Sequence, residues 1–188
     1  MATTKRDDIC DAALDLFVEK GISASTTREI AERAGTAEGN LYRHFAGKDA
    51  LARHLFGVCA GRFRRALIEA AHGEEEPGAR LAALVRSMFR FSREDPKAFA
   101  YILQVHHHEF ATGPVRNPQP LPKDVFAETL QAGMESGAFR PIDPALATSW
   151  IVGMTQRTIT FLETGRVETP RDQVIEETIG ASFRLVQK

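Results

Sequence analysis

The chain has 188 residues, of which 43% are hydrophobic and 26% are charged, and its formal net charge is −1. This composition is typical of a globular protein with a sizeable core. The near-zero net charge excludes a protein that binds nucleic acid through overall basicity. Even the segment up to Ala50 has seven Lys or Arg against nine Asp or Glu. If this segment binds DNA, the local placement of its cations must achieve it.

No stretch approaches about 18 consecutive apolar residues, so we expect no transmembrane helix. Aspartates interrupt the apolar pattern of the N-terminus, which argues against a secretory signal peptide. These features predict a cytoplasmic protein with no membrane partner. The two cysteines, Cys10 and Cys59, belong to no CxxC pair and fall on apolar helical stripes. We interpret them as buried, reduced thiols, with a redox sensor as the alternative.

The first part of the chain has the pattern of four helices. Apolar spacing predicts a helix over residues 5–20. A short second helix should begin after Thr26 or Thr27, which are N-cap candidates, and end at Gly35. A third short helix runs through "AEGNLYRHF", and a long helix follows over residues 48–71.

The remainder also has helical periodicity. Gly, Pro and an acidic run predict a linker over residues 72–79. No strand pattern of usable length and no internal repeat is present, so the predicted fold class is all-α. The expected segments are a helix after residue 79, a restart at Asp95-Pro96 that continues to Phe110, a Pro-rich loop over 111–122, and helices over 123–136, 144–164 and 170–186.

The second and third short helices, joined by the tight turn "AGTA", form a helix-turn-helix arrangement. Such a unit places its last helix in the major groove of DNA. Between Thr26 and Leu51 the chain resembles, without a gap, the TetR family of transcriptional repressors. The matching positions are Thr26, Ile30, Ala31, Ala34, Gly35, Gly39, Leu41, Tyr42, His44, Phe45, Lys48 and Leu51.

This resemblance implies a helix-turn-helix DNA-binding domain over residues 1–47. It also implies a C-terminal helical ligand-binding and dimerisation domain over residues 48–188, in which residues 48–71 form a linking helix. The implied function is that of a ligand-responsive repressor, not an enzyme, that a small-molecule effector releases from a palindromic double-stranded operator. The implied assembly is a homodimer through the last two helices, with no cofactor and no metal.

The resemblance also implies roles for individual residues. Thr27, at a helix N-terminus, suits a phosphate, and Tyr42, His44 and Lys48 resemble family phosphate contacts. Gly39 leaves room for a close approach to DNA. The candidates for contact with base edges are Arg28, Thr36, Ala37, Glu38, Asn40 and Arg43.

The motif departs from the family pattern at two positions. Thr36 stands where Val is common, and Ala37 stands where Ser is common. That Ser would cap the recognition helix. Ala37 cannot accept the capping hydrogen bond, at a cost of about 1 kcal/mol unless Thr36 takes over.

Aromatic and aliphatic side chains in the C-terminal two-thirds are candidates for an effector pocket between helices. Most of them are expected to be plain core, since an apolar stripe at helical spacing is core more often than a ligand cage. Their weak charge indicates a small apolar or amphipathic effector. Arg157 is a candidate for a carboxylate, with a surface arginine as the alternative. His106 is either a polar group at the pocket or a satisfied core histidine. The candidates are Met88, Phe91, Phe99, Ile102, Leu103, His106, Phe126, Leu130, Trp150, Met154, Arg157 and Phe161.

Two other classes of protein remain as alternatives. A helical metal-dependent hydrolase would use His106, Glu109 and His72, but neither an HExxH motif nor a phosphate-binding loop is present. Three consecutive histidines on a helix, His106 to His108, also point in different directions and do not easily share one metal. A helical interaction module that has lost DNA binding is the other alternative, and the departures at Thr36 and Ala37 are its only support.

Overall fold

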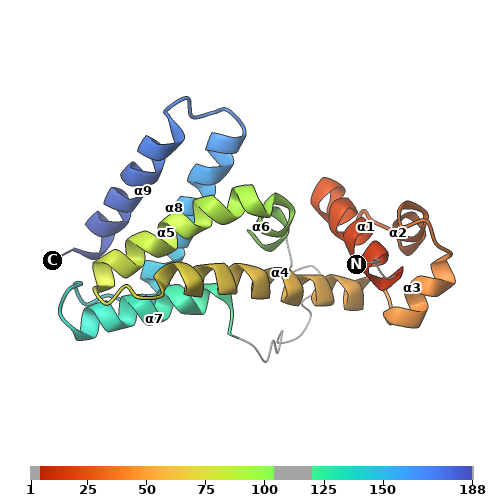
Figure 1. Ribbon diagram of the computed structural model, residues 1–188, viewed down its shortest axis with the longest axis horizontal. Helices are drawn as coiled ribbons and strands as arrows, with labels where there is room; N and C mark the ends of the chain where they lie inside the picture. Colours follow the sequence, from red (N-terminus) through yellow and green to blue (C-terminus); the bar gives the residue numbers. More distant parts are fainter. Residues whose placement is uncertain (1–4, 104–119, 188) are drawn as a thin grey trace. The chain divides into compact units, whose positions relative to one another are not determined.

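The computed structural model describes residues 5–103 and 120–187, and all regular secondary structure in these ranges is helical (Figure 1). The predicted all-α fold class is therefore confirmed. The helices are α1 (Lys5–Lys20), α2 (Thr27–Arg33), α3 (Glu38–His44), α4 (Lys48–Ala71), α5 (Pro77–Glu94), α6 (Pro96–Leu103), α7 (Pro122–Glu135), α8 (Pro144–Glu163) and α9 (Arg171–Val186).

Local sequence signals explain most helix boundaries. The carboxylate of Asp143 accepts hydrogen bonds from the backbone N–H groups of Ala145 and Leu146, at 2.8 and 3.1 Å, and so caps α8 as predicted. The predicted linker over 72–79 is too long, because α5 already begins at Pro77. Proline suits the first position of a helix, since its ring fixes φ near the helical value and no N–H is needed there.

The chain divides into two compact units, of which the first has residues 5–61 and 95–103 as its described part. Its core includes the face of α1 that carries Phe17, against which α6 packs. The ring of Tyr101 lies over that of Phe17, with centroids 6.0 Å apart, and its hydroxyl donates to the carbonyl oxygen of Ala52 (2.9 Å). An ion pair joins Lys97 to Asp15. Helix α6 therefore belongs to the N-terminal unit, although the sequence analysis assigns its residues to the domain that begins at residue 48.

The second unit comprises residues 62–94 and 120–187 among those described. Helix α5 lies at its centre and packs against α7, α8 and α9. The rings of Phe63 and Phe91 stack with centroids 4.8 Å apart. The ring of Phe139 lies so close to Gly133 that a Cβ there would come within 2.1 Å of it, which explains the glycine in α7.

None of the described helices combines the length and the apolar composition needed to cross a membrane. The described residues likewise contain no group of three or more His, Cys, Asp or Glu placed to hold a metal ion. The predicted histidine row, His106 to His108, lies outside the described residues.

Candidate nucleic-acid interface

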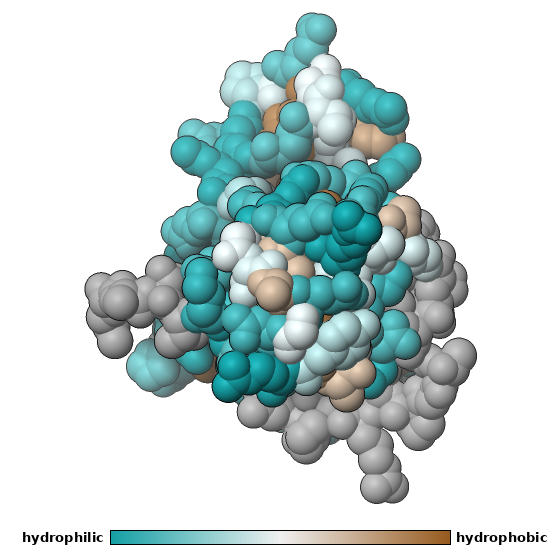
Figure 2. Space-filling view, turned by 90° about the vertical axis from the view of Figure 1, so that its right-hand side faces the viewer, coloured by the Kyte–Doolittle hydropathy of each residue, from teal (hydrophilic) through white to brown (hydrophobic). Residues whose placement is uncertain are grey.

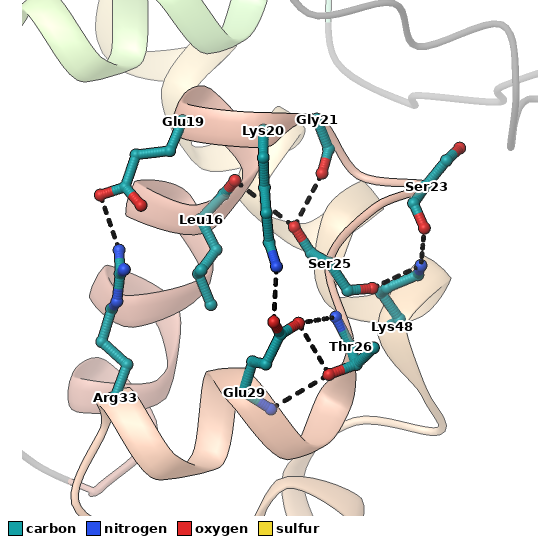
Figure 3. A network of polar contacts seen from close by, with 10 residues as sticks. All are labelled: Leu16, Glu19, Lys20, Gly21, Ser23, Ser25, Thr26, Glu29, Arg33 and Lys48. Atoms are coloured by element: carbon teal, nitrogen blue, oxygen red, sulfur yellow. Dashed lines mark hydrogen bonds and ion pairs between the residues drawn. The ribbon is translucent and has the colours of Figure 1, made fainter.

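The start of α2 is fixed by a reciprocal pair of hydrogen bonds between Thr26 and Glu29 (Figure 3). The Glu29 N–H donates to Thr26 Oγ1 (3.2 Å), and the Thr26 N–H donates to Glu29 Oε2 (2.9 Å). Lys20, at the end of α1, places its Nζ 2.6 Å from Glu29 Oε1. The Lys20 contact, followed by the bonds from Thr26, lowers the pKa of Glu29 to about 2. The N-cap is therefore Thr26, and the same carboxylate ties α2 to α1.

A tight turn connects α2 to α3. Gly35 has a φ of 60°, in the left-handed region that glycine adopts without steric cost. The N–H of Thr36 donates back to the carbonyl oxygen of Ala31 (3.0 Å). Within α3 only Leu41 is buried, and it anchors the helix to the unit's core. The three short helices thus form the predicted helix-turn-helix.

The outer face of α3 is polar and open to solvent. Gly39, Tyr42, Arg43 and His44 are exposed, and 54% of Tyr42 is accessible despite its aromatic ring. Phe45, directly after the helix, is buried instead. Figure 2, viewed from the α2–α3 side of Figure 1, shows a surface dominated by hydrophilic residues. These four exposed residues are among those that the sequence predicts to contact DNA, whereas Glu38 and Asn40, also predicted, are half-buried.

Thr27 links the start of α2 to α3. Its Oγ1 donates to Glu38 Oε1 (2.6 Å) and lies 3.4 Å from the hydroxyl oxygen of Tyr42. Two phosphate candidates and one base-edge candidate therefore lie side by side. Arg28, next to Thr27, donates from Nε to Glu32 Oε1 (2.9 Å) while its side chain remains 79% exposed.

Beside α3 lies an open concavity of about 530 Å³, between the loop before α2 and the start of α4. Hydroxyl groups and two cationic side chains line it. Three of the predicted phosphate contacts, Thr27, Tyr42 and Lys48, meet here, whereas His44 does not line it. The lining residues are Ser23, Ser25, Thr26, Thr27, Tyr42, Ala46, Gly47, Lys48, Asp49, Ala50 and Arg53.

Lys48 has a structural task in this concavity. Its Nζ donates to the backbone carbonyl oxygens of Ser25 (2.7 Å) and Ser23 (3.2 Å), as Figure 3 shows. These bonds connect the first residue of α4 to the loop before α2. They also fix the ammonium group, which has three donors, at the edge of the concavity.

Sequence reasoning missed some of this lining. Ser23, Thr26 and Arg53 line the concavity but were not predicted as phosphate contacts. Arg53 lies four residues after Asp49, which also lines the concavity, so the helical spacing of α4 was the signal that could have found it. Ser23 and Thr26 had no such signal, because only the folded loop brings them to this site.

The predicted effector-pocket residues lie in different surroundings. Phe99 is buried, and Ile102 and Leu103 are half-buried, in the N-terminal unit, whereas the other described candidates belong to the C-terminal unit. Trp150 is 40% exposed on α8, and the Arg157 guanidinium lies 4.7 Å from the ring centroid of Phe161. His106 lies outside the described residues. The candidates in the core of the C-terminal unit are Met88, Phe91, Phe126 and Leu130.

A second concavity, of about 430 Å³, lies between α5 and α9, and none of the predicted effector residues lines it. Three of its arginines are already paired with acids. Arg86 contacts Glu176 at 2.9 Å, Arg90 lies 4.0 Å from Glu94, and Arg171 contacts Glu163. Its positive charge is therefore largely compensated within the protein.

The cysteines have the surroundings of structural thiols. Cys59 is fully buried and Cys10 is half-buried. Burial raises the pKa of the Cys10 thiol, so it stays protonated and weakly nucleophilic at neutral pH.

Comparison with known proteins identifies the family of both parts of the chain. A model of the N-terminal domain of bacterial regulatory proteins of the tetR family matches residues 9–55, and a model of the tetracyclin repressor-like C-terminal domain matches residues 74–173. The HTH-type transcriptional repressor KstR2 of Mycobacterium tuberculosis is 30% identical over 146 residues, which cover 73% of this chain and 70% of that protein.

Solved structures have the same fold over nearly the whole chain. A TetR family transcription regulator from Marinobacter aquaeolei VT8 has a TM-score of 0.82 at 20% identity, over 97% of this chain and 95% of that one. The ketosteroid transcriptional regulator KstR2 of M. tuberculosis has a TM-score of 0.72 at 25% identity, over 100% and 97%. Regulators of this family bind operator DNA and small-molecule effectors and form dimers. The chain belongs to the TetR family of bacterial regulatory proteins.

Proposed function

We propose that this protein is a cytoplasmic, ligand-responsive transcriptional repressor that binds a palindromic operator through α3 and leaves it when a small apolar or amphipathic effector binds. The observation that carries this proposal is the concavity beside α3. It brings Thr27, Tyr42 and Lys48 together next to the exposed polar face of α3, which does not pack into the core of the unit.

The concavity suits a phosphate of the DNA backbone. The hydroxyl of Tyr42 and the remaining N–H of the Lys48 ammonium can donate hydrogen bonds here, whereas the Thr27 hydroxyl already donates to Glu38. The N-terminus of α4 adds the positive end of a 24-residue helix. Arg53 supplies a second positive charge from the next turn. A phosphate held here positions α3 along the groove without reading sequence.

The base sequence is then read by side chains at the start of α3, on its outer face and on neighbouring α2. An arginine pairs with guanine, an asparagine with adenine, a carboxylate with cytosine, and a small apolar group with the thymine methyl. His44 and Gly39 complete the face as a phosphate contact and as a point of close approach. The residues proposed to reach base edges are Arg28, Thr36, Ala37, Glu38, Asn40 and Arg43.

The homodimer is proposed to form through α8 and α9. On α8, Leu146 and Trp150 are 44% and 40% exposed, and Gly153 and Arg157 continue the same face. Large apolar side chains at helical spacing on a surface are typical of protein interfaces. A two-fold dimer presents two α3 helices and so requires a palindrome, with half-sites about 34 Å apart.

Effector binding is proposed to act through α4, which contributes residues to both compact units. The proposed lining is the set predicted from the sequence apart from Trp150 and Arg157, which lie on the proposed dimer face. Its aromatic and aliphatic members supply the apolar contacts. An effector that binds one spacing of the two α3 helices better than the other shifts the dimer toward a form that does not fit the operator.

Enrichment from random DNA duplexes tests the proposal. The purified full-length protein should select a palindrome, and its affinity should fall steeply as salt rises. Failure of a folded dimer to enrich any sequence contradicts the repressor reading and favours the interaction-module alternative. Once an operator is known, effectors are found by the release of the protein from it.

The role of Arg53 is tested by the salt dependence of operator binding. Each phosphate contact contributes about 0.9 to the slope of log K against log salt. Arg53→Gln should therefore reduce the slope by about 1.8 per dimer. Arg65→Gln, a substitution on the same helix but outside the concavity, is the matched control and should leave the slope unchanged.

A further inference from the structure

The first turn of α3 contains a hydrogen bond that does not serve the helix itself. Ala37 is the N-cap residue, and no side chain caps the helix there. The hydroxyl of Thr36 does not take over this task. Instead, Thr36 Oγ1 accepts a hydrogen bond from the side-chain amide of Asn40, with 2.8 Å between Nδ2 and Oγ1.

This contact orients the amide of Asn40. Both residues are half-buried, and Asn40 is flanked by exposed Gly39 and by Leu41, which is fully buried and anchors the helix. An asparagine amide has two N–H donors and one carbonyl acceptor. One donor is engaged by Thr36, which leaves a carbonyl oxygen and one N–H as an adjacent acceptor–donor pair.

Only one base offers the matching edge in the major groove. Adenine presents an acceptor at N7 beside a donor at N6, whereas guanine presents two acceptors. Thymine and cytosine each offer a single group of one kind, an acceptor and a donor respectively. The free edge of the Asn40 amide therefore complements adenine and leaves one of its groups unmatched against any other base.

We propose that Asn40 reads an adenine in each operator half-site and that Thr36 is the positioning residue that holds its amide in the reading orientation. This inference rests on the proposed function, since it needs α3 in the major groove. It assigns a role to Thr36 that does not require the hydroxyl to touch DNA.

The test compares base preference at every operator position. Operators carrying each symmetric base-pair substitution are titrated with the parent protein and with Asn40→Ala, Thr36→Val and Thr36→Ser. The parent should prefer A·T by about 5- to 150-fold at one position per half-site. Asn40→Ala should abolish the preference at that position alone.

The Thr36 variants separate positioning from folding. Thr36→Val keeps the shape but removes the acceptor, so the preference for A·T should fall by about 2- to 12-fold at the same position. Thr36→Ser keeps the acceptor and should retain the preference. Unchanged preference in Thr36→Val, or an Asn40→Ala protein with the parent's profile at all positions, overturns the inference but leaves the proposed function intact. A parent protein that selects no sequence overturns both.

Discussion

Ala37 leaves the N-terminus of the recognition helix without a side-chain cap, although its backbone (φ −76°, ψ 146°) has the extended conformation of an N-cap residue. A serine in this conformation can accept a hydrogen bond from the second or third N–H of the helix. Ala37→Ser should therefore raise the free energy of unfolding of the N-terminal unit by about 1 kcal/mol, measured by urea denaturation.

The control for this prediction is Ala132→Ser, in the interior of α7 at an exposed position. There serine has no free helix N–H to satisfy and lowers helix propensity, so stability should fall slightly. Equal effects of the two substitutions would show that the missing cap has no energetic cost.

His54 is the centre of a small cationic and aromatic contact at the start of α4. Its Nε2 lies 3.1 Å from an Arg6 guanidinium nitrogen, and its ring lies 5.4 Å from that of Phe45 between centroids. Burial, and then the charge of Arg6, lowers the pKa of His54 below its ordinary value of 6.5. The folded protein therefore favours the neutral imidazole.

This shift predicts the direction of a pH effect. Because the unfolded chain binds the proton more readily, the contribution of His54 to stability is complete above pH 6.5 and is lost as the pH falls through that value. Denaturation of the parent and of His54→Gln at pH 7.5, 6.5 and 5.5 measures it. The parent should lose more stability than the variant on acidification, and parallel curves would contradict the assignment.

Individual residues were predictable where their partners are close in sequence. The Thr26 cap, the Gly35 turn and the uncapped Ala37 all follow from neighbours within a few positions. The carbonyl partners of Lys48 were not predictable, because Ser23 and Ser25 lie more than twenty residues earlier and meet it only in the folded unit.

At the scale of elements, α6 is held in the N-terminal unit by a buried hydrogen bond. The hydroxyl of Tyr101 is inaccessible to water and donates to the carbonyl oxygen of Ala52 in α4. Burial raises the pKa of this phenol, so it remains a donor at all moderate pH values. Tyr101→Phe should lower the free energy of unfolding by about 1 kcal/mol, measured by thermal and urea denaturation.

The same variant tests whether this bond matters for regulation. If the hydrogen bond of Tyr101 makes α6 move together with α4, its loss should change the effector concentration that releases the protein from the operator. Ala98→Gly, which alters the core of the same helix without removing a hydrogen bond and lies outside the proposed effector lining, controls for general loosening. A phenylalanine at position 101 with unchanged stability and response would show that ring packing alone holds α6.

Helix positions were largely predictable, because Pro, Gly and Asp caps set them locally. The bounds of α1 and α4 agree with the sequence pattern, and Asp143 caps α8 as expected. The packing partner of α6 was not predictable. The apolar stripe that contains Phe99 indicates that one face of α6 is buried, but it does not indicate which helix packs against that face.

At the scale of the whole molecule, the proposed dimer depends on the exposed face of α8. Trp150→Glu places a charge in that face and should convert the dimer to monomer at micromolar concentration, measured by sedimentation velocity. Operator affinity should fall with it, since a monomer contacts one half-site. Ile68→Glu is the matched control, because Ile68 is a comparably exposed apolar residue, 38% exposed, on α4. If the dimer survives both substitutions, its interface lies elsewhere on the protein.

The effector site is the part of the molecule that helical periodicity constrains least. Periodicity identifies apolar faces, but a face turned toward a core, a ligand or a second subunit has the same pattern. Met88 is fully buried while Trp150 is exposed, although both lie on apolar helical stripes. Only the assembled helices distinguish these environments.

The acidic surroundings of α3 have a consequence for how the protein searches a chromosome. With two more acids than bases up to Ala50, and with Glu38 and Glu32 next to the side chains proposed to contact DNA, contact with an arbitrary duplex should gain little counterion release. We expect short dwell times on random sequence and little sequestration by the bulk genome. A few copies per cell would then suffice to keep one operator occupied, and an effector would meet mostly free or operator-bound protein.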